Sequence, residues 1–133
     1  MTDPRIRYST GPDEVVPQML AGFFEGWRRP LSPEQHLLLL HRSTHCVLAF
    51  DEETGAVVGF INALADGCHC AFIPLLEVLP AYRRRGIGGE LLRRMLAILT
   101  DYPSIDLTCD PDMQAFYERH GMIRSVGMII RRP

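Results

Sequence analysis

The stretch of sequence that decides the fold is Leu76-Glu77-Val78-Leu79-Pro80-Ala81-Tyr82-Arg83-Arg84-Arg85-Gly86-Ile87-Gly88-Gly89-Glu90. An apolar strand runs into a glycine-rich turn, and the turn leads directly into an amphipathic helix that the spacing predicts over residues 86–100. The first N–H groups of a helix have no partners within it, and the helix dipole adds partial positive charge there. Glycines let a phosphate approach the backbone closely, and the three arginines raise the local positive potential. The stretch therefore predicts a site for a diphosphate.

Two common phosphate-binding motifs do not fit this turn. A P-loop needs Gly-Lys-Ser/Thr, but the chain has no lysine, so its 14 basic residues are all arginines. A dinucleotide-binding turn would need a glycine where Leu91 stands. Spacing alone leaves one alternative open, which is a simple helix entry beside a solvated run of arginines.

Outward from the turn, hydrophobic periodicity and turn residues predict alternating strands and helices. Six strands are expected, at residues 5–9, 45–50, 56–64, 69–79, 104–108 and 122–131. Four helices are expected, at residues 13–26, 32–42, 86–100 and 110–120. The order β-α-α-β-β-β-α-β-α-β predicts an α/β fold with a mixed sheet.

Local signals sharpen these expectations at three places. Ser32 is the expected N-cap of its helix, with Pro33 in the first helical position and Gln35 able to close a capping box. Pro74 interrupts the strand expected at 69–79, where a bulge or an exposed N–H side should follow because proline cannot donate to a ladder. Gly121 is expected to end the last helix.

Length and composition limit the class of protein. The chain has 133 residues, 47% of them hydrophobic and 23% charged, which predicts one globular domain over residues 1–133. A formal net charge of −2 disfavours nucleic-acid binding as the main function. The N-terminus carries no apolar signal segment, and no apolar run approaches the ~20 residues that span a membrane. A cytoplasmic protein with no membrane partner is therefore expected.

The cysteines and histidines do not predict a metal centre. In a reducing compartment the four cysteines should be free thiols, and no two of them form a CxxC pair. His41 and His45 lie beside Cys46, and His69 lies between Cys68 and Cys70, but neither spacing is typical of a zinc site. No metal is expected.

Two motifs together resemble one known family. Arg83-x-x-Gly86-x-Gly88, preceded by Val78-x-Pro80, resembles the coenzyme A signature of the GNAT superfamily of N-acetyltransferases. The segment from Asp110 to Met122 resembles the closing motif of the same family, usually written N-x-x-A-x-x-F-Y-E-x-x-G-F. The resemblance implies a GNAT-like mixed sheet flanked by about four helices, and transfer of acetyl from acetyl-CoA directly to an amine in a ternary complex.

The resemblance also implies which residues bind acetyl-CoA. Backbone groups of Val78 and Leu79 would pair with the pantetheine arm. The diphosphate would lie on the turn, whose residues are Arg83, Arg84, Arg85, Gly86, Ile87, Gly88 and Gly89. Asp110, which stands where the family usually has asparagine, and Phe116 would border the cofactor from the second motif.

Catalysis would depend on a proton donor and a proton acceptor. By resemblance, Tyr117 would protonate the thiolate of coenzyme A, and a backbone N–H near Leu79 would hold the oxyanion. Glu77 is the one acid within its strand, and burial would raise its pKa toward the range of a general base. A partner for Arg83 or Arg84 is the structural alternative for Glu77, and a water relay is the alternative base. Glu25 and Trp27 lie in a loop that often lines the acceptor pocket in this family.

The remaining expectations concern partners. The acceptor could be a small-molecule amine or an amine of a peptide or protein. Only eleven residues follow Met122, which leaves room for one closing strand, so a second subunit could complete the sheet in a homodimer. The alternative function is a non-catalytic acyl-CoA-binding sensor or interaction domain. A nucleic-acid-binding regulator would rest on the arginine run alone.

Overall fold

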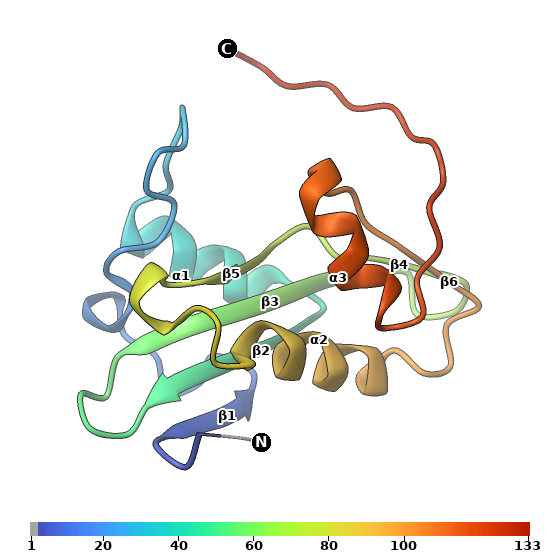
Figure 1. Ribbon diagram of the computed structural model, residues 1–133. Helices are drawn as coiled ribbons and strands as arrows, with labels where there is room; N and C mark the ends of the chain where they lie inside the picture. Colours follow the sequence, from blue (N-terminus) through green and yellow to red (C-terminus); the bar gives the residue numbers. More distant parts are fainter. Residues whose placement is uncertain (1–2) are drawn as a thin grey trace.

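The computed structural model describes residues 3–133 and shows a six-stranded mixed sheet between helices (Figure 1). The strands are β1 (Ile6–Thr10), β2 (His45–Asp51), β3 (Val57–Ala65), β4 (Cys70–Phe72), β5 (Leu76–Val78) and β6 (Ser104–Asp106). Their order is β1-β2-β3-β4-β6, with β5 pairing to β3 beyond the end of β4. All pairs are antiparallel except β4 with β6, which is parallel. The α/β fold with a mixed sheet is confirmed.

Helices cover both faces of this sheet, with α1 (Pro33–Arg42) behind it and α2 (Ile87–Ile98) in front in Figure 1. A short helix, α3 (Gln114–Glu118), follows β6. Three single 3-10 turns complete the elements, namely η1 (Pro17–Leu20), η2 (Pro80–Tyr82) and η3 (Pro111–Met113). No helix in the described residues is long and apolar enough to cross a membrane.

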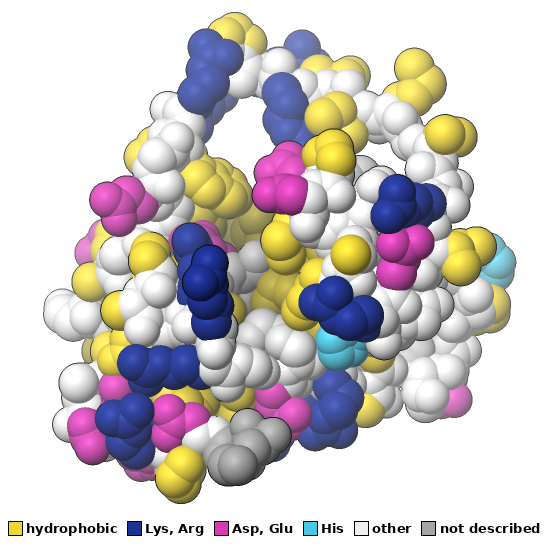
Figure 2. Space-filling model, in the orientation of Figure 1, with side chains coloured by type: hydrophobic (Ala, Val, Ile, Leu, Met, Phe, Trp, Pro, Cys, Tyr) yellow, Lys and Arg dark blue, Asp and Glu magenta, His cyan; other side chains and the backbone are white. Residues whose placement is uncertain are grey.

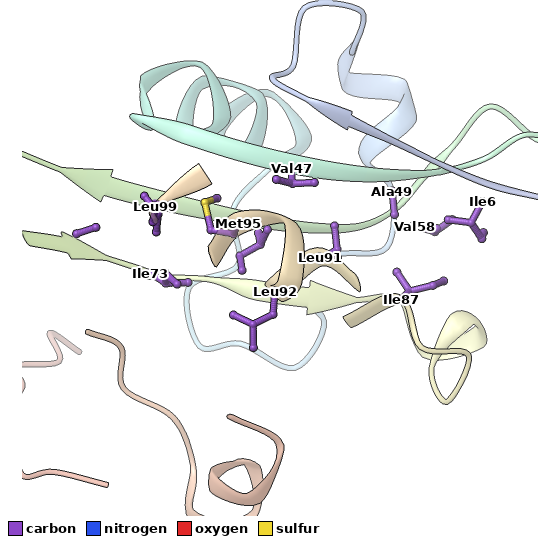
Figure 3. Close-up of a cluster of buried hydrophobic side chains, with 13 residues drawn as sticks. Ile6, Val47, Ala49, Val58, Ile73, Ile87, Leu91, Leu92, Met95 and Leu99 are labelled. Carbon is purple, nitrogen blue, oxygen red and sulfur yellow. The ribbon is translucent and has the colours of Figure 1, made fainter. Parts of the chain in front are cut away.

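The core lies on both sides of β2 and β3, because these two strands are buried on both faces. From Cys46 to Asp51 every residue of β2 is buried, and so is every residue from Val57 to Ala63 of β3. Such continuous apolar strands are typical of a sheet covered on both faces. Figure 3 shows the α2 side of this core, where Leu91, Leu92, Met95 and Leu99 point toward the strands.

The predicted capping box is confirmed, whereas the single strand expected at 69–79 is wrong, because the irregularity expected at Pro74 is a full break instead of a bulge. The Ser32 hydroxyl accepts the Gln35 N–H at 3.1 Å, and the Gln35 side chain accepts the Ser32 N–H at 2.9 Å. At Pro74 the expected strand 69–79 divides into β4 and β5. The buried Asn62 bridges this break, since its Oδ1 accepts the Leu75 N–H at 3.1 Å. This bridge lets the strand change direction while its backbone groups stay bonded.

Two further predicted elements are wrong, and another is shorter than expected. Residues 13–26 form η1 and turns instead of a helix, because Gly22, Phe24 and Gly26 all have positive φ angles. Residues 122–131 form no strand in the described chain, since they have no neighbouring strand to pair with. The helix expected at 110–120 begins as η3 and continues as α3, and it ends before Gly121, whose φ is 92°.

Candidate active site

A wedge-shaped opening between β5 and the chain after β6 forms the candidate site. The Ile73 N–H donates to the Asp106 carbonyl at 2.9 Å, which is the last backbone bond between these two segments in the described chain. Beyond it β5 follows β3, and β6 continues toward α3. The result is a groove of about 1350 Å³. In Figure 2 the hollow at the centre of the molecule is lined by hydrophobic side chains.

The glycine turn borders this groove with unpaired backbone donors. Six consecutive N–H groups, from Arg84 to Gly89, have no hydrogen-bond partner within residues 3–133, and Glu90 is the first residue to bond back, to the Gly86 carbonyl. Gly86 has a φ of 82°, and Arg84 a φ of 63°, so the turn is left-handed at two places. This backbone is suited to an anion, because several N–H groups and the α2 dipole point to one place.

Gly88 and Gly89 lie where the turn meets α3. A Cβ on Gly88 would lie 3.8 Å from Val78 Cγ2 and 3.9 Å from Phe116 Cζ. A Cβ on Gly89 would lie 3.6 Å from Nε2 of His120. Sequence reasoning missed His120, although its place one turn after Phe116 and Tyr117 on the last predicted helix was a usable signal.

The three arginines of the turn have different places. Arg83 and Arg84 line the groove, and Nε of Arg83 donates to the Val78 carbonyl at 3.0 Å. Arg85 is not among the lining residues. Its guanidinium lies over the Tyr82 ring, 5.1 Å from the centroid, and 3.8 Å from the Asp3 carboxylate. Two of the three predicted arginines therefore supply positive charge directly to the groove.

The register of β5 decides which backbone groups face the opening. The Leu79 N–H donates to the Val58 carbonyl at 2.9 Å, and the Leu75 carbonyl accepts the Asn62 N–H at 3.2 Å, so both residues point toward β3. Since direction alternates along an antiparallel ladder, Leu76 and Val78 point to the open side. The Leu79 N–H is therefore bonded to β3, and the N–H near Leu79 that points to the open side is that of Val78.

Glu77 is half-buried and lines the groove. Its two carboxylate oxygens lie 3.3 Å and 3.1 Å from the N–H of Phe24, which donates to them. Burial raises the pKa of Glu77, while the Phe24 N–H and the charge of Arg83 oppose that rise. Glu77 is not ion-paired with Arg83 or Arg84 in the described residues. Burial thus makes this carboxylate a better proton acceptor than an exposed one.

Tyr117 and Phe116 face the groove from α3. Burial, with a smaller contribution from Cys109, raises the pKa of Tyr117 to about 12. The phenol is therefore protonated at neutral pH and can donate its proton. The Phe116 ring lies edge-on to it, with 5.0 Å between centroids.

Of the two residues predicted for the acceptor pocket, only Trp27 lines the groove. Trp27 lines the groove, half-exposed, with its ring edge-on to Phe24 at 4.9 Å. Glu25, in contrast, is exposed and does not line it. Asp110 lines the groove as expected, and so does Asp112, which sequence reasoning did not single out. Among the described residues no group of three His, Cys, Asp or Glu side chains could hold a metal ion.

Comparisons with known proteins agree with this geometry. The chain matches the Acetyltransferase (GNAT) family over residues 13–122. A proposed acetyltransferase from Deinococcus radiodurans R1 is 45% identical, covers 99% of this chain and 94% of its own, and superposes with a TM-score of 0.93. A GNAT family acetyltransferase from Streptococcus pneumoniae TIGR4 is 26% identical over 96% of this chain and 98% of its own, with a TM-score of 0.71.

A third solved structure is similar in fold alone. It is an aminoglycoside acetyltransferase from an uncultured soil sample in complex with sisomicin, 15% identical over 97% of this chain and 95% of its own, with a TM-score of 0.65. No curated protein sequence matches the chain significantly. The chain belongs to the GNAT acetyltransferase family, whose members use acetyl-CoA as co-substrate, and the resemblance seen in the sequence is confirmed.

Proposed function

We propose that this protein is an N-acetyltransferase that transfers acetyl from acetyl-CoA directly to an amine while both are bound. The observation that carries the proposal is the row of six unpaired N–H groups from Arg84 to Gly89 beside the open edge of β5. The row of N–H groups is suited to a diphosphate, and the open edge of β5 is suited to an extended arm that carries amide groups. Acetyl-CoA has both parts, and it supplies the activated acetyl group.

The roles of the groove residues follow from their places. The N–H groups of the turn bind the diphosphate, and the side chains of Arg83 and Arg84 add positive charge. The N–H of Val78 pairs with the pantetheine arm, since the Val78 carbonyl accepts Nε of Arg83 and the Leu79 N–H is bonded to β3. Phe116 packs beside this arm, since it lies against Gly88 and Val78 where the turn meets α3.

Two side chains handle the protons of the reaction. Glu77 takes a proton from the incoming ammonium group, so that the neutral amine attacks the acetyl carbonyl carbon. The bond between that carbon and sulfur breaks, and the Tyr117 phenol gives its proton to the leaving sulfur. The nitrogen, positively charged after the attack, releases its second proton to solvent to become the amide, and a solvent proton restores the phenol. The Phe24 N–H holds the Glu77 carboxylate in place. Glu77 on β5 and Tyr117 on α3 both line the groove, which supports direct transfer between two bound substrates.

The acceptor is an amine, of a small molecule or of a peptide or protein, that enters beside Trp27. Glu77, Asp110 and Asp112 all line the groove, so their carboxylates favour a cationic group. Asp110 and Asp112 lie at the start of the α3 segment, whereas His120, beside the turn, lies at its end. The carboxylates of Asp110 and Asp112 are thus separated along the groove from the proposed diphosphate site.

The test measures release of free coenzyme A thiol from acetyl-CoA with a panel of amines, including an amino sugar, a polyamine and peptides with a free N-terminus or lysine. Saturable, amine-dependent thiol release, with the acetylated amine identified by mass spectrometry, is the expected result. Tight acetyl-CoA binding without release for any amine would favour the non-catalytic sensor instead. If folded protein neither binds acetyl-CoA nor releases thiol, the result contradicts both the enzyme and the sensor.

A further inference from the structure

The glycine turn is anchored in the core where it enters α2, and it needs a second anchor where it leaves η2. Ile87, where α2 begins, is 2% exposed and packs against the sheet. At the other end η2 borders the groove and has no buried residue. Between these ends Arg84 has a φ of 63°, a conformation that costs free energy for a residue with a side chain and persists only where its surroundings enforce it. The end at η2 therefore has to be fixed by a contact other than burial.

Tyr82, the last residue of η2, makes such a contact. Its hydroxyl donates to Oδ2 of Asp51 at 2.5 Å, the length of a charge-assisted hydrogen bond. Asp51 is the last residue of β2 and lies 31 residues earlier in the chain. The bond thus joins η2 to the turn between β2 and β3, and both segments lie at the same end of the sheet in Figure 1.

The Asp51 carboxylate is itself held in place. Asp51 is 7% exposed, and its Oδ1 accepts the Glu53 N–H at 2.8 Å. Its backbone N–H donates to the Ala56 carbonyl at 3.0 Å, and its carbonyl accepts the Gly55 N–H at 2.8 Å. The Tyr82 hydroxyl, and after it the Glu53 N–H, lowers the pKa of Asp51, and the same hydrogen bond raises the pKa of Tyr82. The carboxylate therefore stays ionised and the phenol protonated at neutral pH.

The Tyr82 side chain is the last fixed point before the free donors of the turn. The Tyr82 N–H donates to the Leu79 carbonyl at 2.8 Å, the Arg83 N–H donates to the Pro80 carbonyl at 3.3 Å, and the six unpaired N–H groups follow directly. The ring of Tyr82 lines the groove, and the Arg85 guanidinium lies over it, 5.1 Å from the centroid. The ring therefore supports a side chain of the turn as well as its backbone.

We propose that Tyr82 is a positioning residue for acetyl-CoA, whose hydrogen bond to Asp51 holds the turn in the form that binds the diphosphate. This inference rests on the proposed function, because it takes the turn as the diphosphate site. The hydroxyl gives its proton to Asp51, so it is not a donor to the diphosphate and acts through the backbone that follows it.

The proposal differs from a purely structural role in what it predicts for different ligands. A hydrogen bond that only stabilised the fold would change the free energy of unfolding and would affect every ligand of the groove alike. A bond that positions the turn affects ligands that carry the diphosphate and spares those that lack it.

Titration of the full chain with acetyl-CoA and, by competition, with acetylpantetheine, which lacks the diphosphate, makes this distinction. In Tyr82→Phe the Kd for acetyl-CoA should rise by about tenfold, and the Kd for acetylpantetheine should stay as in the wild type. Asp51→Asn keeps an oxygen that can accept the hydroxyl, so it should lose less affinity for acetyl-CoA than Tyr82→Phe does. Tyr82 is only half-buried, so Tyr82→Phe should remain folded, which circular dichroism checks.

Tyr8→Phe is the matched control, because the Arg94 guanidinium lies over the Tyr8 ring, 4.4 Å from the centroid, but Tyr8 does not line the groove. This variant should bind both ligands as the wild type does. Equal acetyl-CoA affinity in Tyr82→Phe and the wild type would overturn the proposal, and so would an equal loss of affinity for both ligands. If the wild type itself does not bind acetyl-CoA, the proposed function is contradicted and the inference with it.

Discussion

One wall of the acetyl-CoA groove is anchored in the core, and the other lies at the margin of the fold. Ile87, Leu91, Leu92 and Met95 of α2 are fully buried against the sheet, as Figure 3 shows. No residue of α3 is fully buried. The backbone proposed to bind the diphosphate is therefore held rigidly before any ligand arrives, whereas the position of Tyr117 depends on few contacts. The difference implies that variants in the first wall should affect binding and variants in the second should affect turnover.

The largest effect is expected at the anchored wall, from Gly88→Asp. A carboxylate placed among the N–H groups proposed to bind the diphosphate would repel it and fill the space between Val78 and Phe116. Acetyl-CoA affinity should fall by at least about 1000-fold. Gly88→Ala is the control, because its Cβ would make only ordinary contacts at 3.8 Å and 3.9 Å. Affinity retained by a folded Gly88→Asp protein would place the diphosphate elsewhere.

At the marginal wall, Tyr117→Phe should lower kcat by roughly 100-fold and leave the Kd for acetyl-CoA nearly unchanged. The variant removes only the proton that the phenol donates and keeps the ring in place. Steady-state kinetics and calorimetric titration separate the two quantities. Tyr102→Phe, which changes a tyrosine outside the groove, should have no effect. Unchanged turnover in Tyr117→Phe, with chemistry limiting the rate, would remove Tyr117 from the mechanism.

Glu77 lies on the wall that is anchored in the core, but its loss is expected to affect turnover. A Glu77 variant therefore tests whether the two walls divide binding from turnover. Glu77→Gln should lower kcat/KM by about tenfold at neutral pH, since water can partly replace the base. Gln keeps an oxygen that accepts the Phe24 N–H, so the loop should remain in place. The carboxylate is the active form and its pKa is raised, so wild-type kcat/KM should increase as pH rises through that pKa. If kcat/KM of Glu77→Gln still increases with pH over the same range, another group is the base.

The smallest effect concerns stability behind the sheet, where His36 is fully buried among Phe23, Phe24 and Phe60. Neither ring nitrogen has a hydrogen-bond partner within residues 3–133, and burial lowers the pKa of His36 to about 4. Because the unfolded chain takes up a proton first, stability is full above about pH 6.5 and declines below it.

The free energy of unfolding of the wild type should therefore fall by about 2 kcal/mol between about pH 7.5 and about pH 5 through this group. In His36→Leu the free energy of unfolding should decline by about 2 kcal/mol less over the same pH range. Urea unfolding of both proteins at the two pH values measures the difference, and equal declines would show that His36 is not buried as a neutral group.

The sequence predicted those features that local chemistry determines. The capping box of α1 depends on Ser32 and Gln35 alone, and the glycine-rich turn into α2 depends on one continuous stretch of sequence. Both were predictable because the responsible residues are neighbours in the chain. The groove likewise follows from Pro74, which divides one predicted strand into two with different partners.

Features that depend on distant contacts were not predictable in the same way. The loop 13–26 has the apolar spacing of a helix, but Glu77 binds the Phe24 N–H, and Phe24 has a φ of 65°. The orientation of Leu79 toward β3 depends on strand register, which the motif does not contain. The segment 122–131 has the alternation of a strand but finds no partner strand within the described chain.

Isothermal titration of the purified protein with acetyl-CoA, with NAD and ATP as controls, tests the central claim most directly. The six unpaired N–H groups and the open edge of β5 predict saturable binding of acetyl-CoA at one site per chain and far weaker binding of the two nucleotides. Equal binding of acetyl-CoA, NAD and ATP would show that the turn is a general anion site. No binding of acetyl-CoA by folded protein would contradict the proposed function.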